Sequence, residues 1–211
     1  MKTDQLIDLL ARQAGPAPRH VVERRIAIAA IVGVLASTAL TCATLGVNTA
    51  LADMGSALAV KLAYVIALMA GAAWQVDRLA RPGASDQAAT QALLAVVLAM
   101  ALVAGRAWVR TPSAEPLDQL LGQSWSSCIW RVAALSLPAL GAGLWALRGL
   151  APTRPRRAGF AAGLLAGSLG ALGYSLYCAE LSPMFVLAWY SAGMLVPAAL
   201  GALLGPRLLR W

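Results

Sequence analysis

Cysteine is the residue type in this sequence best suited to carry chemistry. The 211 residues include three cysteines and one histidine, and they contain no P-loop, HExxH or GxSxG motif. Cys128 stands where one long apolar segment begins, and Cys178 stands where a later one ends. Paired thiols allow a structural disulfide, a redox switch or a soft-metal site. The simpler interpretation is that all three cysteines are small buried hydrophobic residues, and we favour this interpretation only for Cys42.

Glu180 lies two residues after Cys178 and offers an oxygen ligand for the same site. The alternative is a solvated carboxylate in a loop. No resident cofactor is expected, and a soft metal ion held transiently by Cys128 and Cys178 is the one cofactor that this pattern allows. His20 stands alone in a polar segment, so the sequence predicts a protein that is not an enzyme.

The composition is that of a membrane protein. Hydrophobic residues make up 60% of the chain, the mean hydropathy is +0.70 and only 12% of residues are charged, whereas a soluble domain carries roughly 25% charge. A chain of this length has no soluble core large enough to bury so much apolar surface. We therefore expect an all-α integral membrane bundle of six transmembrane helices. The predicted spans are 26–46, 57–76, 88–108, 129–147, 158–178 and 184–204.

The arginines predict the orientation of this bundle. Most of them fall before the first span, after the last one and in the two loops that share that side: Arg24, Arg25, Arg78, Arg81, Arg148, Arg154, Arg156, Arg157, Arg207 and Arg210. The positive-inside rule then places both termini in the cytoplasm. The chain divides into a cytoplasmic tail (1–25), a transmembrane domain (26–204) and a cytoplasmic C-terminus (205–211). Cys128 and Cys178 then meet at the outer membrane level.

Charged and small residues inside the spans add three expectations. Lys61 lies near the start of the second span and is expected to extend outward to the interface. Arg131 is expected to do the same, or to pair with Glu180 or Asp118. Glycines at 159, 163 and 167 recur every fourth residue of the fifth span, a pattern that favours close helix packing in lipid.

The first residues have the pattern of a short amphipathic helix. Asp4 suits its first turn, and Leu6, Leu9 and Leu10 share one side. Such a helix can dock into the groove of a partner protein, or it can lie on the membrane surface. The sequence leaves both interpretations open for Asp4, Leu6, Leu9 and Leu10.

Several segments resemble the six-helix negative-regulator-of-sigma-F (NrsF-like) family of membrane anti-sigma factors. The most specific are Gly122-Gln-Ser-Trp-Ser-Ser-Cys-Ile-Trp and Tyr177-Cys-Ala-Glu-Leu-Ser-Pro-Met-Phe. Further matches are Met1-Lys-Thr-Asp, Ala151-Pro-Thr-Arg-Pro, Trp189-Tyr-Ser-Ala-Gly-Met and the ending Gly205-Pro-Arg-Leu-Leu-Arg-Trp. The likeness runs from end to end, although the first three spans match mainly in hydropathy, and Cys42 is not part of the pattern.

The resemblance implies a function. The protein would sit in the bacterial inner membrane as a multi-pass regulator of transcription and hold an extracytoplasmic-function sigma factor inactive on the cytoplasmic side. Heavy-metal or oxidative stress, sensed by Cys128 and Cys178, would release that factor. Its partners would be the sigma factor and membrane lipid, with no direct contact to nucleic acid.

Two other classes of function compete with this one. A membrane thiol oxidoreductase would need a Cys-x-x-Cys motif or two cysteine pairs, and the sequence offers one pair at the outer level. A small transporter would need buried carboxylates in its spans, and the apolar segments carry none. Both are therefore weaker than the regulator.

Overall fold

The computed structural model of the protein describes residues 20–210 apart from 82, 113, 114 and 151, together with Thr3 and Gln5. Asp4, Leu6, Leu9 and Leu10, the proposed partner-binding residues of the tail, lie outside the described residues. The described part of the chain is helical and contains no strand, as the sequence predicts. The long helices are α2 (Val21–Thr44), α3 (Gly55–Ala80), α4 (Gln87–Arg110), α6 (Trp125–Arg148), α7 (Pro155–Tyr174) and α9 (Ser191–Leu208).

Short helical segments connect the long helices. They are η1 (Thr49–Met54), α5 (Pro116–Leu121), α8 (Pro183–Phe185) and η2 (Val186–Tyr190). Proline occupies the first turn of α5, α7 and α8, where its fixed φ suits a helix and its missing N–H costs nothing. Gly122 ends α5 with φ 57°, a conformation that glycine adopts without strain, and so turns the chain into α6.

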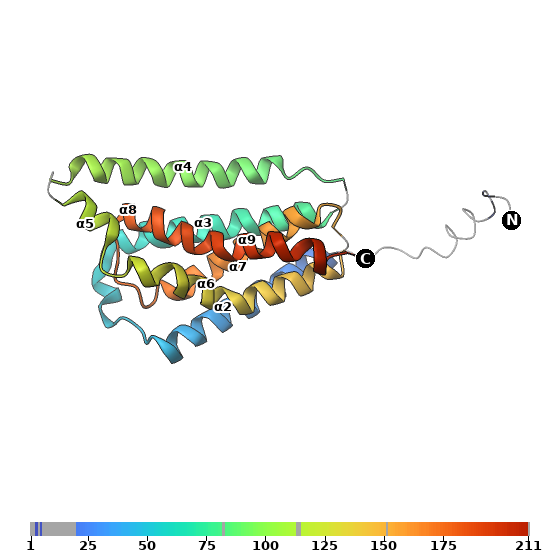
Figure 1. Ribbon diagram of the computed structural model, residues 1–211, viewed down its shortest axis with the longest axis horizontal. Helices are drawn as coiled ribbons and strands as arrows, with labels where there is room; N and C mark the ends of the chain where they lie inside the picture. Colours follow the sequence, from blue (N-terminus) through green and yellow to red (C-terminus); the bar gives the residue numbers. More distant parts are fainter. Residues whose placement is uncertain are drawn as a thin grey trace.

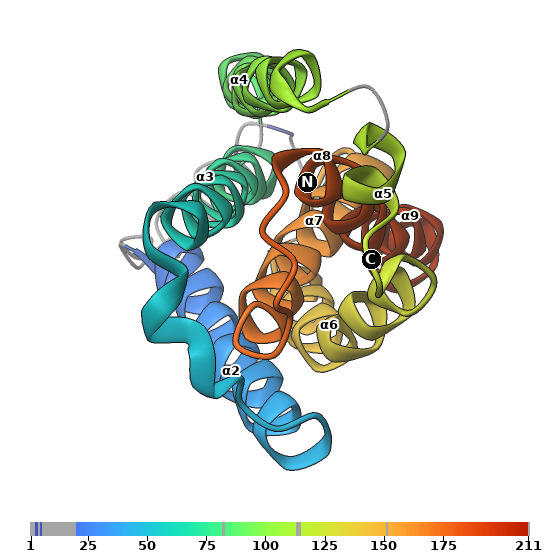
Figure 2. The same ribbon diagram turned by 90° about the vertical axis from the view of Figure 1, so that its left-hand side faces the viewer.

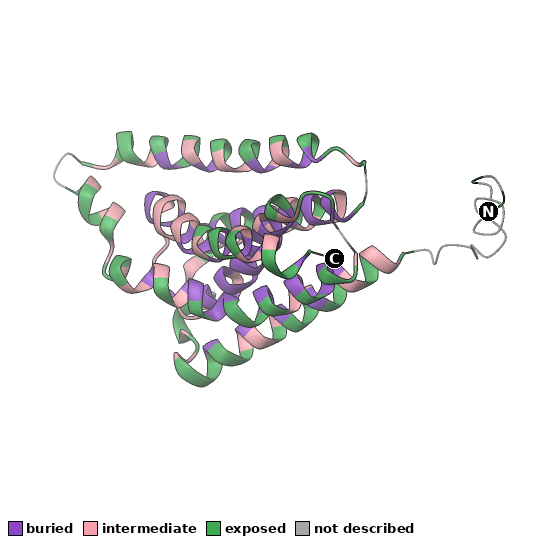
Figure 3. Cartoon of the chain, turned by 45° about the vertical axis from the view of Figure 1, so that its right-hand side comes forward, coloured by how far each residue is buried: buried purple, intermediate pink, exposed green. Residues whose placement is uncertain are grey.

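The long helices run side by side along one axis (Figure 1). Viewed end-on, α7 lies in the centre with α2, α3, α6 and α9 around it, and α4 stands at the edge beside α3 (Figure 2). Burial follows this arrangement, since α7 is buried along most of its length while α4 is largely exposed (Figure 3). The segments that hold Cys128 and Cys178 therefore border the best-packed part of the molecule.

Five helical stretches are long and apolar enough to cross a membrane. They are Val21–Thr44, Gly55–Ala80, Gln87–Arg110, Pro116–Arg148 and Pro183–Leu208. The glycine-rich α7, which corresponds to the fifth predicted span, is not among them. Because its neighbours enclose it, α7 presents little surface to a surrounding solvent of any kind. The structure supports a membrane protein, and the count of six spans stays a prediction.

The glycines of α7 bring it into close contact with α9. A methyl group on Gly163 would overlap the carbonyl oxygen of Pro197, and one on Gly167 would lie 2.7 Å from the Met194 carbonyl oxygen. Gly159 and Gly201 face each other in the same way. The close packing expected from the repeated glycines is confirmed, and it fixes α9 against the central helix.

The helix ends define two faces of the bundle. Figure 1 shows α2 beginning and α9 ending at one end, with α5, η1 and α8 at the other. We call the first the terminal end and the second the loop end. The predicted fifth span runs too far, because α7 stops at Tyr174 and Cys178 lies in the loop beyond it.

Candidate functional site

The loop between α7 and α8, residues 175–182, carries Cys178 and Glu180, and we call it the cysteine loop. After α7 ends, the chain makes tight turns, in which the Tyr177 and Cys178 amides both donate to the Tyr174 carbonyl. The Asn48 amide, next to η1, donates to the Leu176 carbonyl over 2.9 Å. The loop is therefore fixed by backbone hydrogen bonds at the loop end of the bundle.

Both predicted sensor cysteines are buried in one cluster. Cys128, in the first turn of α6, is 0% exposed, and Cys178 is 2% exposed. Both are free thiols, and both belong to the same cluster of buried residues. Cys42 is also a free thiol, but the expectation that it is buried is wrong, because it lies on an exposed face of α2. The structure thus brings Cys128 and Cys178 into one neighbourhood from separate elements and leaves Cys42 out of it.

Lys61 is the residue of this site that the sequence interpretation misplaced. Its side chain does not extend outward as expected, because acceptors for its ammonium lie inside the bundle, and it is 1% exposed. Its Nζ donates to the carbonyl oxygens of Cys178, at 2.8 Å, and of Glu180, at 3.1 Å. A lysine in an apolar helix marks a functional position by default, and that signal was present in the sequence.

Two tyrosines complete the polar surroundings of the thiols. Tyr190 lies 4.8 Å from the Lys61 ammonium, measured to the ring centroid, and its ring is 5.8 Å from that of Tyr174. Both rings are fully buried, and neither hydroxyl has a hydrogen-bond partner among the described residues. A thiolate formed here would find an ammonium and two hydroxyl donors close by.

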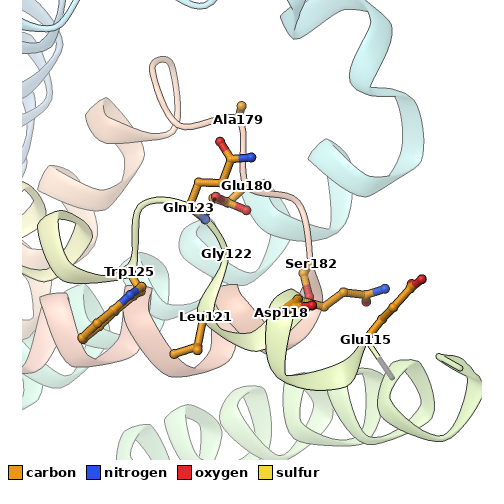
Figure 4. A pocket seen from close by; sticks show the side chains of 10 residues that line it. Glu115, Asp118, Leu121, Gly122, Gln123, Trp125, Ala179, Glu180 and Ser182 are labelled. Atoms are coloured by element: carbon orange, nitrogen blue, oxygen red, sulfur yellow. Dashed lines mark hydrogen bonds between the residues drawn. The ribbon is translucent and has the colours of Figure 1, made fainter. Parts of the chain in front are cut away.

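The carboxylate of Glu180 contacts the segment that leads into α6. Its Oε1 accepts a hydrogen bond from the backbone N–H of Gln123 over 2.7 Å. The carboxylate also covers Gly122, where an added Cβ would lie 2.8 Å from the carboxylate atoms. Glu180 thereby ties the cysteine loop to the segment that leads into α6. It also lines an open cavity of about 870 Å³ with Glu115 and Asp118 (Figure 4).

The donor set around the thiols is small for a metal ion. The described residues contain no group of three His, Cys, Asp or Glu side chains that could hold one. Glu180 is occupied by the Gln123 amide and does not complete a set with Cys128 and Cys178. A soft ion bound by these two thiolates would need its remaining ligands from outside the chain.

A second cavity gives access to one of the two thiols. It has a volume of about 340 Å³ at the loop end, and Cys178 and Tyr174 line it while Cys128 does not. Arg131 also lines it and places its guanidinium 5.2 Å from the Tyr177 ring centroid. In the described part of the chain Arg131 therefore stacks on an aromatic ring, and it forms no ion pair with Glu180 or Asp118.

Helix α3 connects this site to the terminal end. Near that end, Gln75 donates to the Thr90 hydroxyl of α4 over 3.0 Å. Arg81, just after α3, donates to Asp77, at 2.8 Å, and to Glu23 of α2, at 2.9 Å. Hydrogen bonds from Arg81 to Asp77 and then to Glu23 raise the pKa of its guanidinium. The helix that holds the cysteine loop through Lys61 thus also contacts α2 and α4 about 20 residues further on.

Comparison with known proteins agrees with these features. The family model described as "Negative regulator of sigma F" matches residues 10–211. A "Probable anti-sigma-F factor NrsF" of Azospira oryzae is 42% identical over 216 residues, and an "Anti-sigma-F factor NrsF" of Caulobacter vibrioides is 40% identical over 218 residues. Each alignment covers 100% of both chains, and no solved structure matches. These relatives are regulators and not enzymes, and the chain belongs to the NrsF family of negative regulators of sigma F.

Proposed function

We propose that this chain is an inner-membrane anti-sigma factor that binds an extracytoplasmic-function sigma factor and keeps it inactive in the cytoplasm. The end-to-end identity with two anti-sigma-F factors and the five membrane-compatible helices support this proposal. The terminal end, where the arginines gather, faces the cytoplasm, and the loop end faces the periplasm. The chain crosses the membrane six times, with α7 as the enclosed helix.

The input to this regulator is a change at Cys128 and Cys178. The observation that carries this step is the burial of two free thiols beside Lys61 and two unpartnered tyrosine hydroxyls. Cys178, which lines the second cavity, reacts first. With hydrogen peroxide as the oxidant, its thiolate attacks one oxygen, the O–O bond breaks, and a sulfenic acid and a hydroxide form, the latter taking up a proton to give water. The Cys128 thiol then attacks the sulfenic sulfur, and a second water leaves as the disulfide forms.

A soft divalent metal ion uses the same two sulfurs by a different reaction. Both thiols lose their protons, and two S–metal bonds form, while water or another external ligand fills the remaining positions. No electron changes hands in this step. Either reaction requires Cys128 and Cys178 to adjust their separation, so each one displaces the cysteine loop relative to α6.

Lys61 and Gln123 carry this displacement into the helices. Lys61 holds the loop backbone at two carbonyls, and Gln123 holds the Glu180 carboxylate at the start of α6. Because α3 and α6 both run to the terminal end, a shift in the loop alters the cytoplasmic surface that binds the sigma factor. Regulation then corresponds to a coupling free energy between the thiols and that surface.

The cytoplasmic tail supplies part of the contact with the sigma factor. The sequence pattern predicts an amphipathic helix with Leu6, Leu9 and Leu10 on its apolar side and Asp4 at its start. Deleting residues 1–18 tests this contact by co-purification with the sigma factor that the protein binds. The expected result is loss of the sigma factor and constant expression of a sigma-dependent reporter. A reporter that stays silent after the deletion would show that the tail is not needed.

Cysteine variants test the sensor. Cys128→Ser and Cys178→Ser are each expected to keep the reporter silent and to abolish its induction by peroxide or cadmium. Cys42→Ser is the matched control, because this exposed thiol lies outside the site, and its induction should equal that of the wild type. Normal induction in either of the first two variants would overturn the sensor assignment, while loss of silence before any stress would indicate damage to sigma binding instead.

A further inference from the structure

A third cavity lies at the terminal end, on the opposite side of the molecule from the cysteines. Its volume is about 640 Å³, and residues of α3, α4, α7 and α9 line it. One part of its lining is polar and includes Gln75, Asp86, Arg156 and Arg157; the other part is apolar and includes Phe160 and Leu203. None of these residues takes part in the cysteine site, so this cavity is separate from it.

The polar part is suited to an anion. Asp86 lies 3.5 Å from Arg154 and 3.7 Å from Arg157, which leaves Arg156 without a carboxylate partner among the described residues. These arginines begin α7, a helix of 20 residues. The Ala158 amide is the one that donates to the Arg154 carbonyl, so the two preceding amides lie before this first helical bond. A helix N-terminus with two arginines beside it favours a phosphate group.

Gln75 shows that the occupant also donates hydrogen bonds. This side chain is only 8% exposed, and its amide nitrogen donates to Thr90. Its carbonyl oxygen is buried with no partner in the described part of the protein. A buried acceptor without a donor is unfavourable, and the Asp86 carboxylate provides a second acceptor in the same cavity. A ligand with hydroxyl groups next to its phosphate would satisfy both.

The apolar part opens toward the side of the bundle. Leu203 on α9 is 65% exposed, and Phe160 on α7 lies beside it in the lining. Helix α4 packs chiefly against α3 and otherwise against α8 and η2, near the loop end. At the terminal end α4 therefore stands away from α9 (Figure 2). In a membrane this opening would face the acyl chains of the inner leaflet.

We infer that this cavity binds one phospholipid with an anionic, hydroxyl-bearing headgroup, the class of phosphatidylglycerol. The phosphate lies at Arg156, Arg157 and the start of α7, and the headgroup hydroxyls donate to Gln75 and Asp86. One acyl chain follows Phe160 and Leu203. The excess of arginine over carboxylate in the cavity favours an anionic lipid over a zwitterionic one. The inference rests on the membrane location in the proposed function but not on sigma-factor binding.

Native mass spectrometry of the full-length protein in detergent, with dioctanoyl phosphatidylglycerol as the probe, tests this site. The wild type is expected to bind one lipid at least about tenfold more tightly than dioctanoyl phosphatidylcholine. Arg156→Gln and Gln75→Leu should each weaken phosphatidylglycerol binding by about tenfold. Arg207→Gln, which removes an exposed charge from α9 at the same end, is the matched control and should leave binding unchanged. Thermal unfolding of each variant verifies that it is folded.

Three outcomes would overturn the assignment. Equal binding of the two lipids would remove the role of the headgroup, and equal weakening by Arg207→Gln would indicate an unspecific effect of charge. Inorganic phosphate binding as tightly as the lipid would assign the site to a free anion. Co-purified sigma factor reports separately on the proposed function, because the lipid site can fail while sigma binding persists, and the reverse also holds.

Discussion

The Lys61 ammonium donates a hydrogen bond to the Cys178 carbonyl over 2.8 Å, although the two residues are 117 positions apart in the chain. A second bond from the same ammonium reaches the Glu180 carbonyl. These contacts hold the loop that carries one sensor thiol against a helix that runs the length of the bundle. A hydrogen bond to a charged group typically contributes about 1.5–3 kcal/mol, which is enough to keep the loop closed.

Replacing Lys61 with methionine is expected to open the cysteine loop. Loss of the ammonium leaves the two carbonyls without their donor, so the thiol of Cys178 becomes accessible more often. We expect alkylation by N-ethylmaleimide in intact membranes to be about tenfold faster or more, from the contribution of charged hydrogen bonds to local closure. Mass spectrometry of the modified peptide measures this rate.

Arg106→Met is the matched control for that experiment, because Arg106 is an exposed cation on α4 that lies outside the cysteine site. Its alkylation rate should equal that of the wild type. An unchanged rate in Lys61→Met would show that the buried ammonium does not hold the loop.

Glu180→Ala is expected to loosen the same loop from its other side. The backbone N–H of Gln123 loses its acceptor. Since this contact is partly exposed, the loss in the free energy of unfolding should not exceed about 1–2 kcal/mol. The expected result is a lower unfolding temperature in detergent and faster alkylation of Cys178. Glu115→Ala, which removes another carboxylate of the same cavity, should change neither. Identical behaviour of the two variants would deny Glu180 a role in holding the loop.

Gly163→Ala is expected to destabilise the packing of α7 on α9. The added methyl would overlap the Pro197 carbonyl oxygen, which belongs to backbone and has little freedom to move. Overpacking of this kind costs about 1–3 kcal/mol. Thermal unfolding of the full-length protein measures the loss. Gly141→Ala, in α6, is the control, because a Cβ there meets no other atom, and its stability should be unchanged or slightly higher. Equal stability of the two variants would contradict the close packing.

Hydropathy, helix-breaking residues and the glycine repeat were enough to locate the long helices within a few residues. The six predicted ranges each overlap a helix of the structure, because apolar length and flanking polar residues are local properties. The repeat of Gly159, Gly163 and Gly167 also identified a contact face correctly. The end of α7 was misplaced because hydropathy continues past Tyr174, while the turns that stop the helix depend on the loop around it.

The interior of the site could not be predicted in the same way. Lys61 was expected at the interface, since the sequence does not reveal that carbonyls of residues 178 and 180 lie within its reach. The unpartnered hydroxyls of Tyr174 and Tyr190 likewise depend on how α7 and η2 pack. Cysteine positions relative to the span ends did predict a shared neighbourhood. Helices α6 and α7 are antiparallel and similar in length, so the short loop that joins them at the terminal end also brings their other ends to the same level.

Release of the sigma factor from purified complex tests whether a reaction at Cys178 ends sigma-factor binding. The full-length protein with its bound sigma factor is placed in nanodiscs and treated with hydrogen peroxide or with cadmium, and free sigma factor is measured after filtration. The wild type is expected to release the sigma factor with at least one agent, and Cys178→Ser is expected to retain it with both. Equal release from Cys178→Ser and the wild type, or retention by the wild type under both treatments, would contradict it.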